Sequence, residues 1–190
     1  MSIGRRRLAC LAPAALLAAC SSPDPALYTL QMKPGPVLPK GPAVVQLRDI
    51  SLARYLDRRE IVRSSADYKL GVMANDWWGE PLGAMLSRVI VLGLSQRLPS
   101  STVYGEGGAI SADPNAVLAV NIQRLEPDGS GANVELLAQA AVEFNRPRRT
   151  ANRSFRIAKP LPARTVAGQV AATSDAIGEL TDGLAALLAR

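Results

Sequence analysis

One cysteine near the start of the chain, Cys20, stands where its thiol could do chemistry. It directly follows the small residues Ala18 and Ala19, which end an apolar run from Leu8, and a basic cluster at 5–7 lies ahead of this run. A basic segment, a short apolar segment and small residues at a cleavage position are the three parts of a secretory signal peptide. The apolar run is shorter than the ~20 residues that a membrane-spanning helix needs. We therefore predict a cleaved signal peptide over residues 1–19.

The four residues Leu17-Ala18-Ala19-Cys20 resemble the lipobox of bacterial lipoproteins. In that motif the cysteine thiol receives a diacylglycerol, the peptide before it is removed, and the new amino group is acylated, with palmitate as a typical chain. Several acyl chains together hold a protein stably in a membrane, since each buried methylene contributes ~0.8 kcal/mol. Ser21, and not aspartate, follows the cysteine, which favours export to the outer membrane.

The rest of the chain is expected to be a tether over residues 20–25 and one domain over residues 26–190. The tether reaches roughly 20 Å when fully extended, so the domain would sit close to its membrane. A chain of this length can bury a single hydrophobic core. Of the 22 basic residues three leave with the signal peptide, and none of the 16 acidic residues does, so the mature net charge is +3. This modest charge gives little indication of nucleic-acid binding.

The mature chain lacks the side chains that most catalytic sites use. It has no histidine, which excludes Ser-His-Asp triads and imidazole metal sites. Cys10 leaves with the signal peptide and Cys20 is consumed by lipid, so no thiol remains for a nucleophile, zinc or a disulfide. Glu126 and Asp128 could serve a glycosidase, but Asp128-Gly129 beside a proline is typical of a turn. We predict no enzyme, no metal and no cofactor apart from the covalent lipid. A hydrolase with paired carboxylates facing one cleft is the alternative.

Hydrophobic periodicity predicts the elements that must position any site. Strands are expected at 26–32, 44–48, 60–64, 68–74, 101–104, 116–125, 133–144 and 151–158. Asp76, Glu80 and Pro81 predict a helix start, and a helical repeat follows to Leu98. A second helix is expected from about Thr165 to the end of the chain. Because strands and helices do not alternate strictly, the sequence predicts an α+β fold. This would be a single domain with an antiparallel-rich mixed sheet and two long helices packed on one face.

Three segments are candidates for binding. Trp77-Trp78 could anchor a partner, or one ring could belong to the core while the other caps it. The poorly periodic stretch over residues 55–59 is typical of an interface loop, and a salt-bridged surface loop explains it equally well. The basic run over Arg146–Arg156 could meet anionic headgroups, although a solvated hairpin tip is the preferred interpretation. Its one aromatic residue, Phe155, is expected to face inward on a strand, so the run has no series of rings for base stacking and we expect no nucleic-acid partner.

Several motifs together resemble one known family. They are Tyr28-x-Leu30, then Tyr-Leu-Asp-Arg-x-x-Ile-Val-Arg over residues 55–63, and Trp-Gly-Glu-Pro-Leu over residues 78–82. The chain is similar to the ABC-type transport auxiliary lipoproteins of the PqiC/YmbA type, from the lipobox to the last helix. That family usually has Arg-Trp-Ala-Glu-Pro-Leu at this point. This chain departs from the motif, since the arginine is absent and Gly79 replaces alanine.

The resemblance implies a small α+β lipoprotein on the periplasmic face of the outer membrane. It would serve an ABC-type envelope transport system that moves lipids or other hydrophobic molecules and maintains membrane integrity. Its implied partners are an MCE-domain protein that spans the periplasm, the inner-membrane permease, and further copies of itself in a ring. The partner-docking candidates are Tyr55, Leu56, Asp57, Arg58, Trp77, Trp78, Glu80 and Pro81. A lipoprotein assembly factor or chaperone that binds an outer-membrane barrel or a cell-wall component is the alternative, and it would lack an MCE partner.

Overall fold

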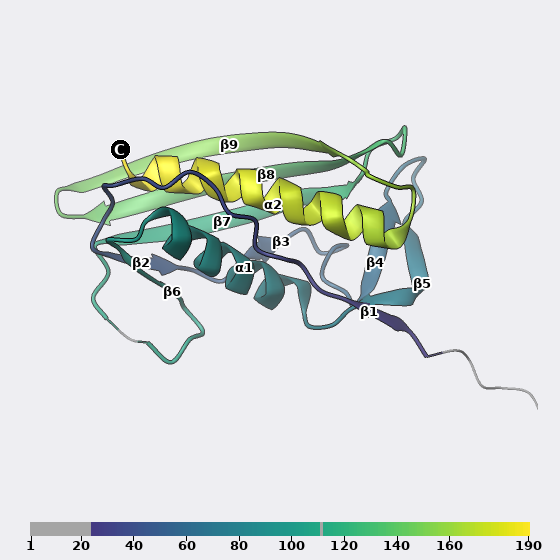
Figure 1. Ribbon diagram of the computed structural model, residues 1–190, viewed down its shortest axis with the longest axis horizontal. Coiled ribbons are helices and arrows are strands. Elements are labelled where there is room, and N and C mark those ends of the chain that lie inside the picture. Colours follow the sequence, from purple (N-terminus) through teal and green to yellow (C-terminus); the bar gives the residue numbers. More distant parts are fainter. Residues whose placement is uncertain (1–23, 111) are drawn as a thin grey trace, which may run out of the picture.

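The computed structural model describes residues 24–110 and 112–190, so Cys20 and the predicted signal peptide lie outside the described residues. The strands are β1 Ala26–Tyr28, β2 Val44–Leu47, β3 Ser51–Leu52, β4 Glu60–Ser64, β5 Gly71–Trp78, β6 Thr102–Gly105, β7 Ala116–Pro127, β8 Asn133–Asn145 and β9 Arg148–Pro160. The helices are α1 Leu82–Arg97 and α2 Val166–Leu188. The predicted α+β fold with a mixed sheet and two long helices is confirmed (Figure 1).

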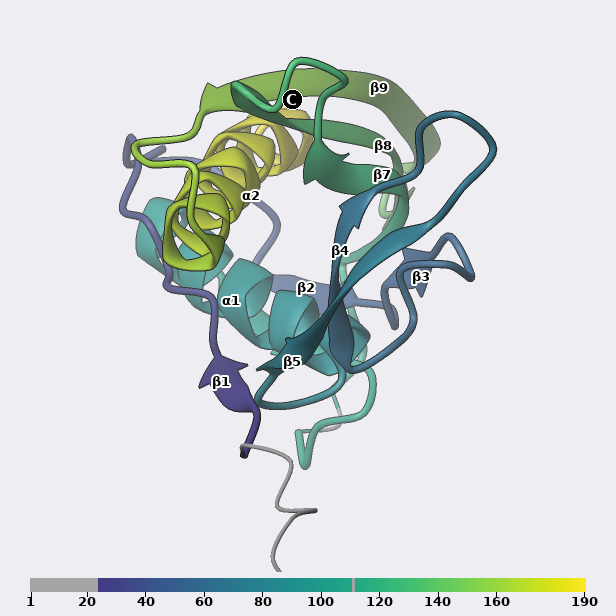
Figure 2. The same ribbon diagram turned by 90° about the vertical axis from the view of Figure 1, so that its right-hand side faces the viewer.

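A six-stranded sheet carries both helices on one face. Its order is β6-β2-β7-β8-β9, with β3 paired to β7 beside this path. The strands β7, β8 and β9 form an antiparallel meander, whereas β2 is parallel to both of its neighbours. The alternation predicted for 133–144 is confirmed, because the apolar set is buried: Val134, Leu136, Ala138, Ala140, Val142 and Phe144. Figure 2 shows this sheet curling around the helix pair.

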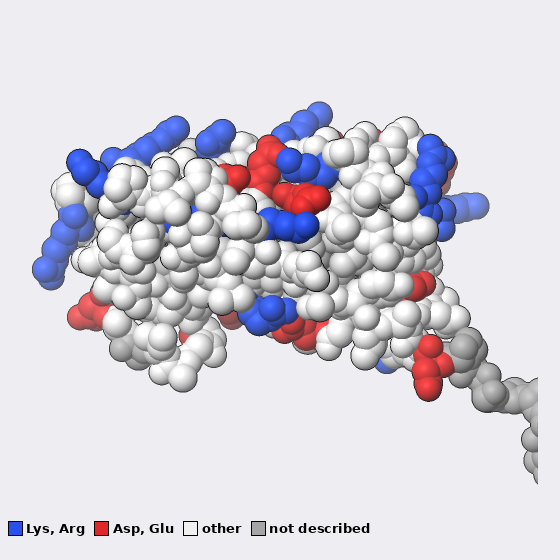
Figure 3. All heavy atoms as spheres, viewed as in Figure 1, with Lys and Arg blue, Asp and Glu red and all other residues white. Residues whose placement is uncertain are grey.

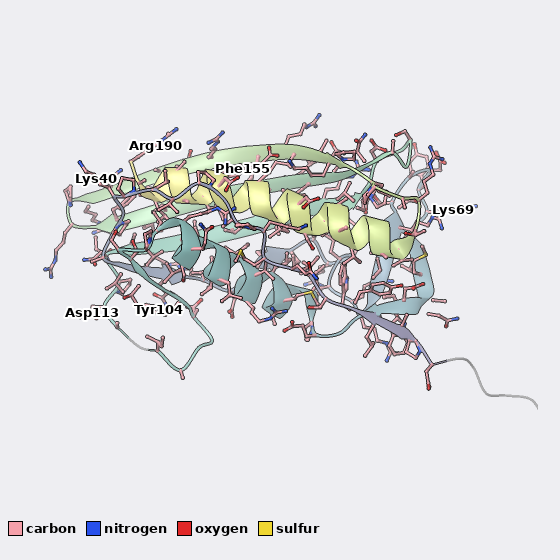
Figure 4. The ribbon with its side chains drawn as sticks, viewed as in Figure 1. Lys40, Lys69, Tyr104, Asp113, Phe155 and Arg190 are labelled. Carbon is pink, nitrogen blue, oxygen red and sulfur yellow. The ribbon has the colours of Figure 1, made fainter. Side chains whose placement is uncertain are left out.

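The helix α2 lies close to the sheet because its packing face combines apolar residues with glycine. A Cβ atom at Gly183 would lie 2.3 Å from Cε1 of Phe155, so only glycine lets the helix backbone approach this ring. The Phe155 ring projects from β9 toward α2 (Figure 4). The predicted start of this helix at about Thr165 is confirmed. Thr165 is the N-cap, and its hydroxyl oxygen accepts a hydrogen bond from the Gly168 amide at 3.1 Å.

Replacing Thr165 with alanine should lower the free energy of unfolding by about 1 kcal/mol, because the Gly168 amide loses its acceptor at the helix end. Urea denaturation measures this change. Thr165→Ser keeps the hydroxyl and should stay close to the parent value. An equal loss in both variants would mean that the methyl group, and not the cap, stabilises the helix.

The helix start predicted within 76–82 lies at the end of that segment, where Pro81 was expected near the first helical position, and residues 76–78 belong to a strand. Strand β5 continues through Trp78, where Leu27 of β1 pairs with Trp77 on one side and Glu60 of β4 on the other. Helix α1 begins only at Leu82, and Pro81 is its N-cap residue. Aromatic side chains favour extended strands, and Pro81 restricts the residue before it to extended conformations. Both effects delay the start of the helix.

The hairpin partner predicted at 68–74 begins later than expected, at Gly71. Asp67 and Tyr68 instead form the turn, with φ angles of 54° and 58°. The Lys69 amide donates to the Ala66 carbonyl at 3.0 Å and closes this turn. Together β1, β5 and β4 form a separate three-stranded sheet at one end of the molecule (Figures 1 and 2).

The proline-rich segment from 29 to 43 forms an extended strap across the two helices (Figure 1). The first predicted strand therefore ends at Tyr28 and not at 32. The strap is hydrogen-bonded to both helices: the Gln31 amide donates to Ser174 of α2 at 3.2 Å, and the Gly35 amide donates to Gln96 of α1 at 2.9 Å. These bonds satisfy a backbone that no sheet covers.

A buried arginine joins α1, α2 and the strap. Arg97 is 1% exposed, and its guanidinium donates to the carbonyls of Gly93 and Gly178 at 3.0 Å each and to Asp182 at 2.6 Å. A Cβ atom at Gly35 would lie 2.3 Å from its Nη2 atom, so the strap passes directly over it. Arg97 thus fixes the position of three segments that are distant in the sequence.

Candidate docking site

The two segments that the sequence indicated for docking lie beside each other. The antiparallel pairing of β4 with β5 brings the loop before β4 next to the connection between β5 and α1. The Trp78 amide donates to the Arg59 carbonyl at 2.7 Å and joins the two. Between them is a hollow of about 300 Å³, lined by Asp57, Arg58, Arg59, Trp78, Glu80, Pro81 and Leu82. The fold therefore brings five of the eight docking candidates to one place.

The hollow combines apolar and charged walls. Trp78 and Leu82 are buried and contribute apolar atoms, whereas Asp57 is exposed. The Arg58 side chain is fixed through its Nε atom, which donates to the Tyr55 carbonyl at 3.1 Å. Such a small apolar depression with charged groups around it fits a side chain presented by a protein partner.

The Glu80 carboxylate is tied to the body of the protein. Arg88 of α1 donates to it through Nε at 3.1 Å and also contacts it through Nη2. The same guanidinium donates to Thr29 Oγ1 at 3.3 Å. One wall of the hollow is therefore held in place by both α1 and the start of the strap.

Three docking candidates lie outside the hollow. Leu56 is 2% exposed and belongs to the core. Trp77 is half-buried on the other side of the strand, where its Nε1 atom donates to the Ala74 carbonyl at 2.9 Å and the Arg59 guanidinium lies 4.1 Å from its ring centroid. Tyr55 turns toward β7, and its hydroxyl donates to the Gln123 carbonyl at 3.5 Å. Of the two tryptophans, Trp78 is in the core and Trp77 covers the outer face of the sheet.

A buried polar cluster surrounds Glu126, which is completely inaccessible to solvent. Its carboxylate accepts a hydrogen bond from the Ser65 hydroxyl and lies 3.3 Å from Arg124 Nε. Burial, followed by the Glu126 charge, raises the pKa of Tyr55 to about 12. Asp128 instead closes the β7–β8 turn, where hydrogen bonds from Ser130 and Asn133 lower its pKa. The two carboxylates do not face one cleft as the hydrolase alternative required.

The neutral phenol of Tyr55 should make stability sensitive to alkaline pH. Its folded-state pKa of about 12 lies above the ordinary value of 10.0, so the folded protein keeps a proton that the unfolded chain loses. This contribution is fully present below pH 10 and is lost as the pH rises through about 12. Urea denaturation across this pH range should show that the free energy of unfolding falls less steeply with pH for Tyr55→Phe than for the parent. A matched Tyr68→Phe variant should keep the parental slope, and a shallower slope there too would contradict the assignment.

Sequence reasoning missed a larger hollow on the face of the sheet that the helices leave open. It measures about 500 Å³ and is lined by polar and small residues that include Asn121, Gln139, Asn152 and Ser154. In the sequence, only the polar residues that alternate with the apolar ones along these strands could have indicated this hollow. Arg48, Asp49 and Arg153 also line the hollow. Polar and charged residues that alternate along a strand indicate solvent exposure as readily as binding, so they do not identify a site.

The basic run predicted as a hairpin tip extends along β9. Its guanidinium groups partly cover aromatic rings of β8 and β9, with Arg149 3.6 Å from the centroid of Phe144 in β8 and Arg153 5.0 Å from that of Phe155 in β9. Arg156 lies 3.9 Å from Glu135. These contacts give several of the arginines a local structural role. Neither helix in the described ranges 24–110 and 112–190 has the length and apolar character needed to cross a membrane.

Comparison with known proteins gives the family. The model of the ABC-type transport auxiliary lipoprotein component matches residues 28–185. The crystal structure of protein XCC0632 from Xanthomonas campestris, of the DUF330 family model, is similar with 20% sequence identity and a TM-score of 0.68, over 86% of this chain and 96% of that one. A crystal structure of an uncharacterized protein is similar with 16% identity and a TM-score of 0.71, over 86% and 97%. A search of curated proteins found no match. Because the family model covers most of the chain, this protein belongs to the ABC-type transport auxiliary lipoproteins.

Proposed function

We propose that this protein is the outer-membrane-anchored subunit of an MCE-type envelope transport system and docks its periplasm-spanning MCE component to the membrane. Family membership supports a role in transport. The observation that carries the docking role is the hollow in which Asp57, Arg58, Glu80 and Pro81 meet. Lipid attached to Cys20 would hold the protein on the periplasmic face, and the cargo would be lipid or another hydrophobic molecule.

The proposed mechanism divides the task between anchor and hollow. A tether of residues 20–25 keeps the body within roughly 20 Å of the bilayer, so the partner must bridge the periplasm. An apolar side chain of that partner would enter against Trp78, while Asp57 and Arg58 select its charged neighbours. The inner-membrane permease would then be connected to the outer membrane through the MCE component, and a ring of copies would multiply the contacts.

The first experiment is gentle detergent extraction of the tagged, lipidated protein, followed by identification of co-purifying proteins. We expect the MCE-domain protein together with its permease. The double variant Asp57→Lys, Arg58→Glu reverses two charges at the hollow and should reduce the co-purified MCE protein by about tenfold. Arg54→Glu is the matched control, because Arg54 is exposed in the same loop but does not line the hollow.

Two outcomes would contradict the proposal. An outer-membrane barrel or peptidoglycan fragments in place of an MCE protein would assign the chain to the assembly-factor class. Equal recovery of the MCE protein by parent and double variant would place docking elsewhere. A separate Cys20→Ala variant should be lost from the membrane fraction and recovered in the soluble fraction. This tests lipid anchoring independently of docking.

A further inference from the structure

Exposed apolar side chains gather at one end of the molecule. Four of the seven large apolar residues that are exposed in the described chain belong to the three-stranded sheet and its hairpin: Leu27 at 67%, Tyr68 at 109%, Leu70 at 39% and Val72 at 38%. The other three lie on the strap, on α1 and in the loop after β6. Single exposed apolar residues need no explanation, but a gathering of them marks an interaction surface.

The turn of the β4–β5 hairpin presents Tyr68 in an unusual way. Asp67 and Tyr68 both have positive φ, in a two-residue turn where glycine or asparagine is the usual occupant. A tyrosine is disfavoured here by its side chain, and its ring gains no compensating burial because it is fully exposed. An aromatic ring with a polar tip suits the boundary between hydrocarbon and water.

Cationic residues lie on the hairpin and beside it. Arg63 and Lys69 belong to the hairpin and Arg164 precedes α2, and none of the three forms an ion pair with residues 24–110 or 112–190. Figure 3 shows Lys and Arg side chains gathered at this end, and Figure 4 places Lys69 opposite the end that holds Lys40 and Arg190. Asp67 of the turn and Asp128, which lines one hollow with Arg63 and Arg164, are the acidic residues beside them, and the three cations outnumber these two. Such a surface attracts anionic headgroups.

The tether leaves from the same end. Strand β1 begins at Ala26 and pairs with β5 of the hairpin, and Figures 1 and 2 show both at one end of the long axis. Only residues 20–25 separate Ala26 from the proposed lipid on Cys20. This end therefore faces the bilayer at a distance that the tether limits to roughly 20 Å.

We propose that this end is a second membrane contact, in which Tyr68 and Leu70 enter the interface of an anionic phospholipid surface while Arg63, Lys69 and Arg164 bind its headgroups. The inference rests on the lipid anchoring at Cys20 proposed above. One flexible tether would leave the body free to rotate. A second contact fixes the long axis relative to the bilayer and so presents the docking hollow in a defined direction.

Spin labels can measure the depth of this contact in the full-length lipidated protein. The mature chain has no free thiol, so a single Tyr68→Cys or Leu70→Cys side chain carries one nitroxide. In vesicles of phosphatidylethanolamine and phosphatidylglycerol, we expect collisions with oxygen to exceed those with a water-soluble nickel complex at both positions. Ile110→Cys is the matched control, since Ile110 is also exposed but lies in the loop after β6, and it should show the reverse.

A charge variant tests the headgroup part of the proposal. Arg63→Glu combined with Lys69→Glu should raise nickel access at position 68 several-fold, whereas Arg148→Glu at the other end of the molecule should not. Flotation of the vesicles tests the lipid anchor at Cys20 separately from the second membrane contact. Protein that fails to float with the vesicles lacks the lipid anchor. Floating protein with equal nickel access at 68 and 110 would overturn the membrane contact. Shielding of position 68 only after addition of an MCE protein would also overturn it and assign the surface to that partner.

Discussion

Replacing Arg97 with alanine is expected to lower the free energy of unfolding by about 3 kcal/mol. The substitution removes three hydrogen bonds at once, and the carbonyls of Gly93 and Gly178 lose their second donor while they stay buried between the helices. It also opens a cavity under the strap at Gly35. Asp182 is partly exposed, so its carboxylate can be solvated by water in the variant. The expected loss of unfolding free energy therefore lies near the lower end of the range for breaking a buried ion pair.

Urea denaturation followed by circular dichroism measures the loss for Arg97→Ala. Arg88→Ala is the matched control from the same helix, because its ion pair with Glu80 is solvent-exposed and should contribute less than about 1 kcal/mol. Arg97→Lys should lie between the two, since an ammonium group cannot reach all three acceptors. Equal stability of the Arg97 and Arg88 alanine variants would show that the strap and helices hold together without this side chain.

Replacing Trp78 with alanine is expected to cost about 3–5 kcal/mol, because the ring is 8% exposed and fills the core beneath the hollow. Trp78→Phe keeps part of this volume and should cost less. The parent and both variants can be compared by thermal unfolding. A small loss for Trp78→Ala would mean that the site collapses readily around the missing ring.

This prediction decides how docking variants are interpreted. Loss of partner binding in Trp78→Ala would accompany a loss of stability and would not identify a contact. The pair Asp57 and Arg58 is the sharper test, because Asp57 is exposed and Arg58 is half-buried with one hydrogen bond to the Tyr55 carbonyl. Charge reversal there should cost about 1 kcal/mol or less of unfolding free energy while it weakens docking. A variant that lost docking and stability together at these two positions would mark them as structural.

Periodicity identified the elements that bury one continuous face. The strand β8 and the helix α2 were predicted closely because their apolar residues recur with periods of 2 and 3.6 over many residues. The sequence did not place Trp77-Trp78 in a strand, because Asp76 and Pro81 are both typical of a helix start and neither marks where the preceding strand ends. The pairing with Leu27 and Glu60 decides between them, and it is not local in the sequence.

Arg97 was missed for a related reason. A basic residue in the last turn of a helix is ordinarily a solvated partner of the helix dipole. Its burial depends on Gly178 of α2 and Gly35 of the strap, and no spacing in the sequence connects these positions. The docking segments were recognised individually, but their meeting at one hollow depends on the β4–β5 register.

The parallel pairing of β1 with β5 also determines how the protein bears mechanical load. A partner that pulls the body away from the membrane would stretch the tether and draw β1 lengthwise past β5. In this shearing geometry the hydrogen bonds at residues 26–28 share the force, whereas in an unzipping geometry they would break one after another. Behind β1, the strap transfers the remaining tension to both helices through Gln31 and Gly35. Under the membrane anchoring proposed above, traction on the tether would therefore load these contacts in shear.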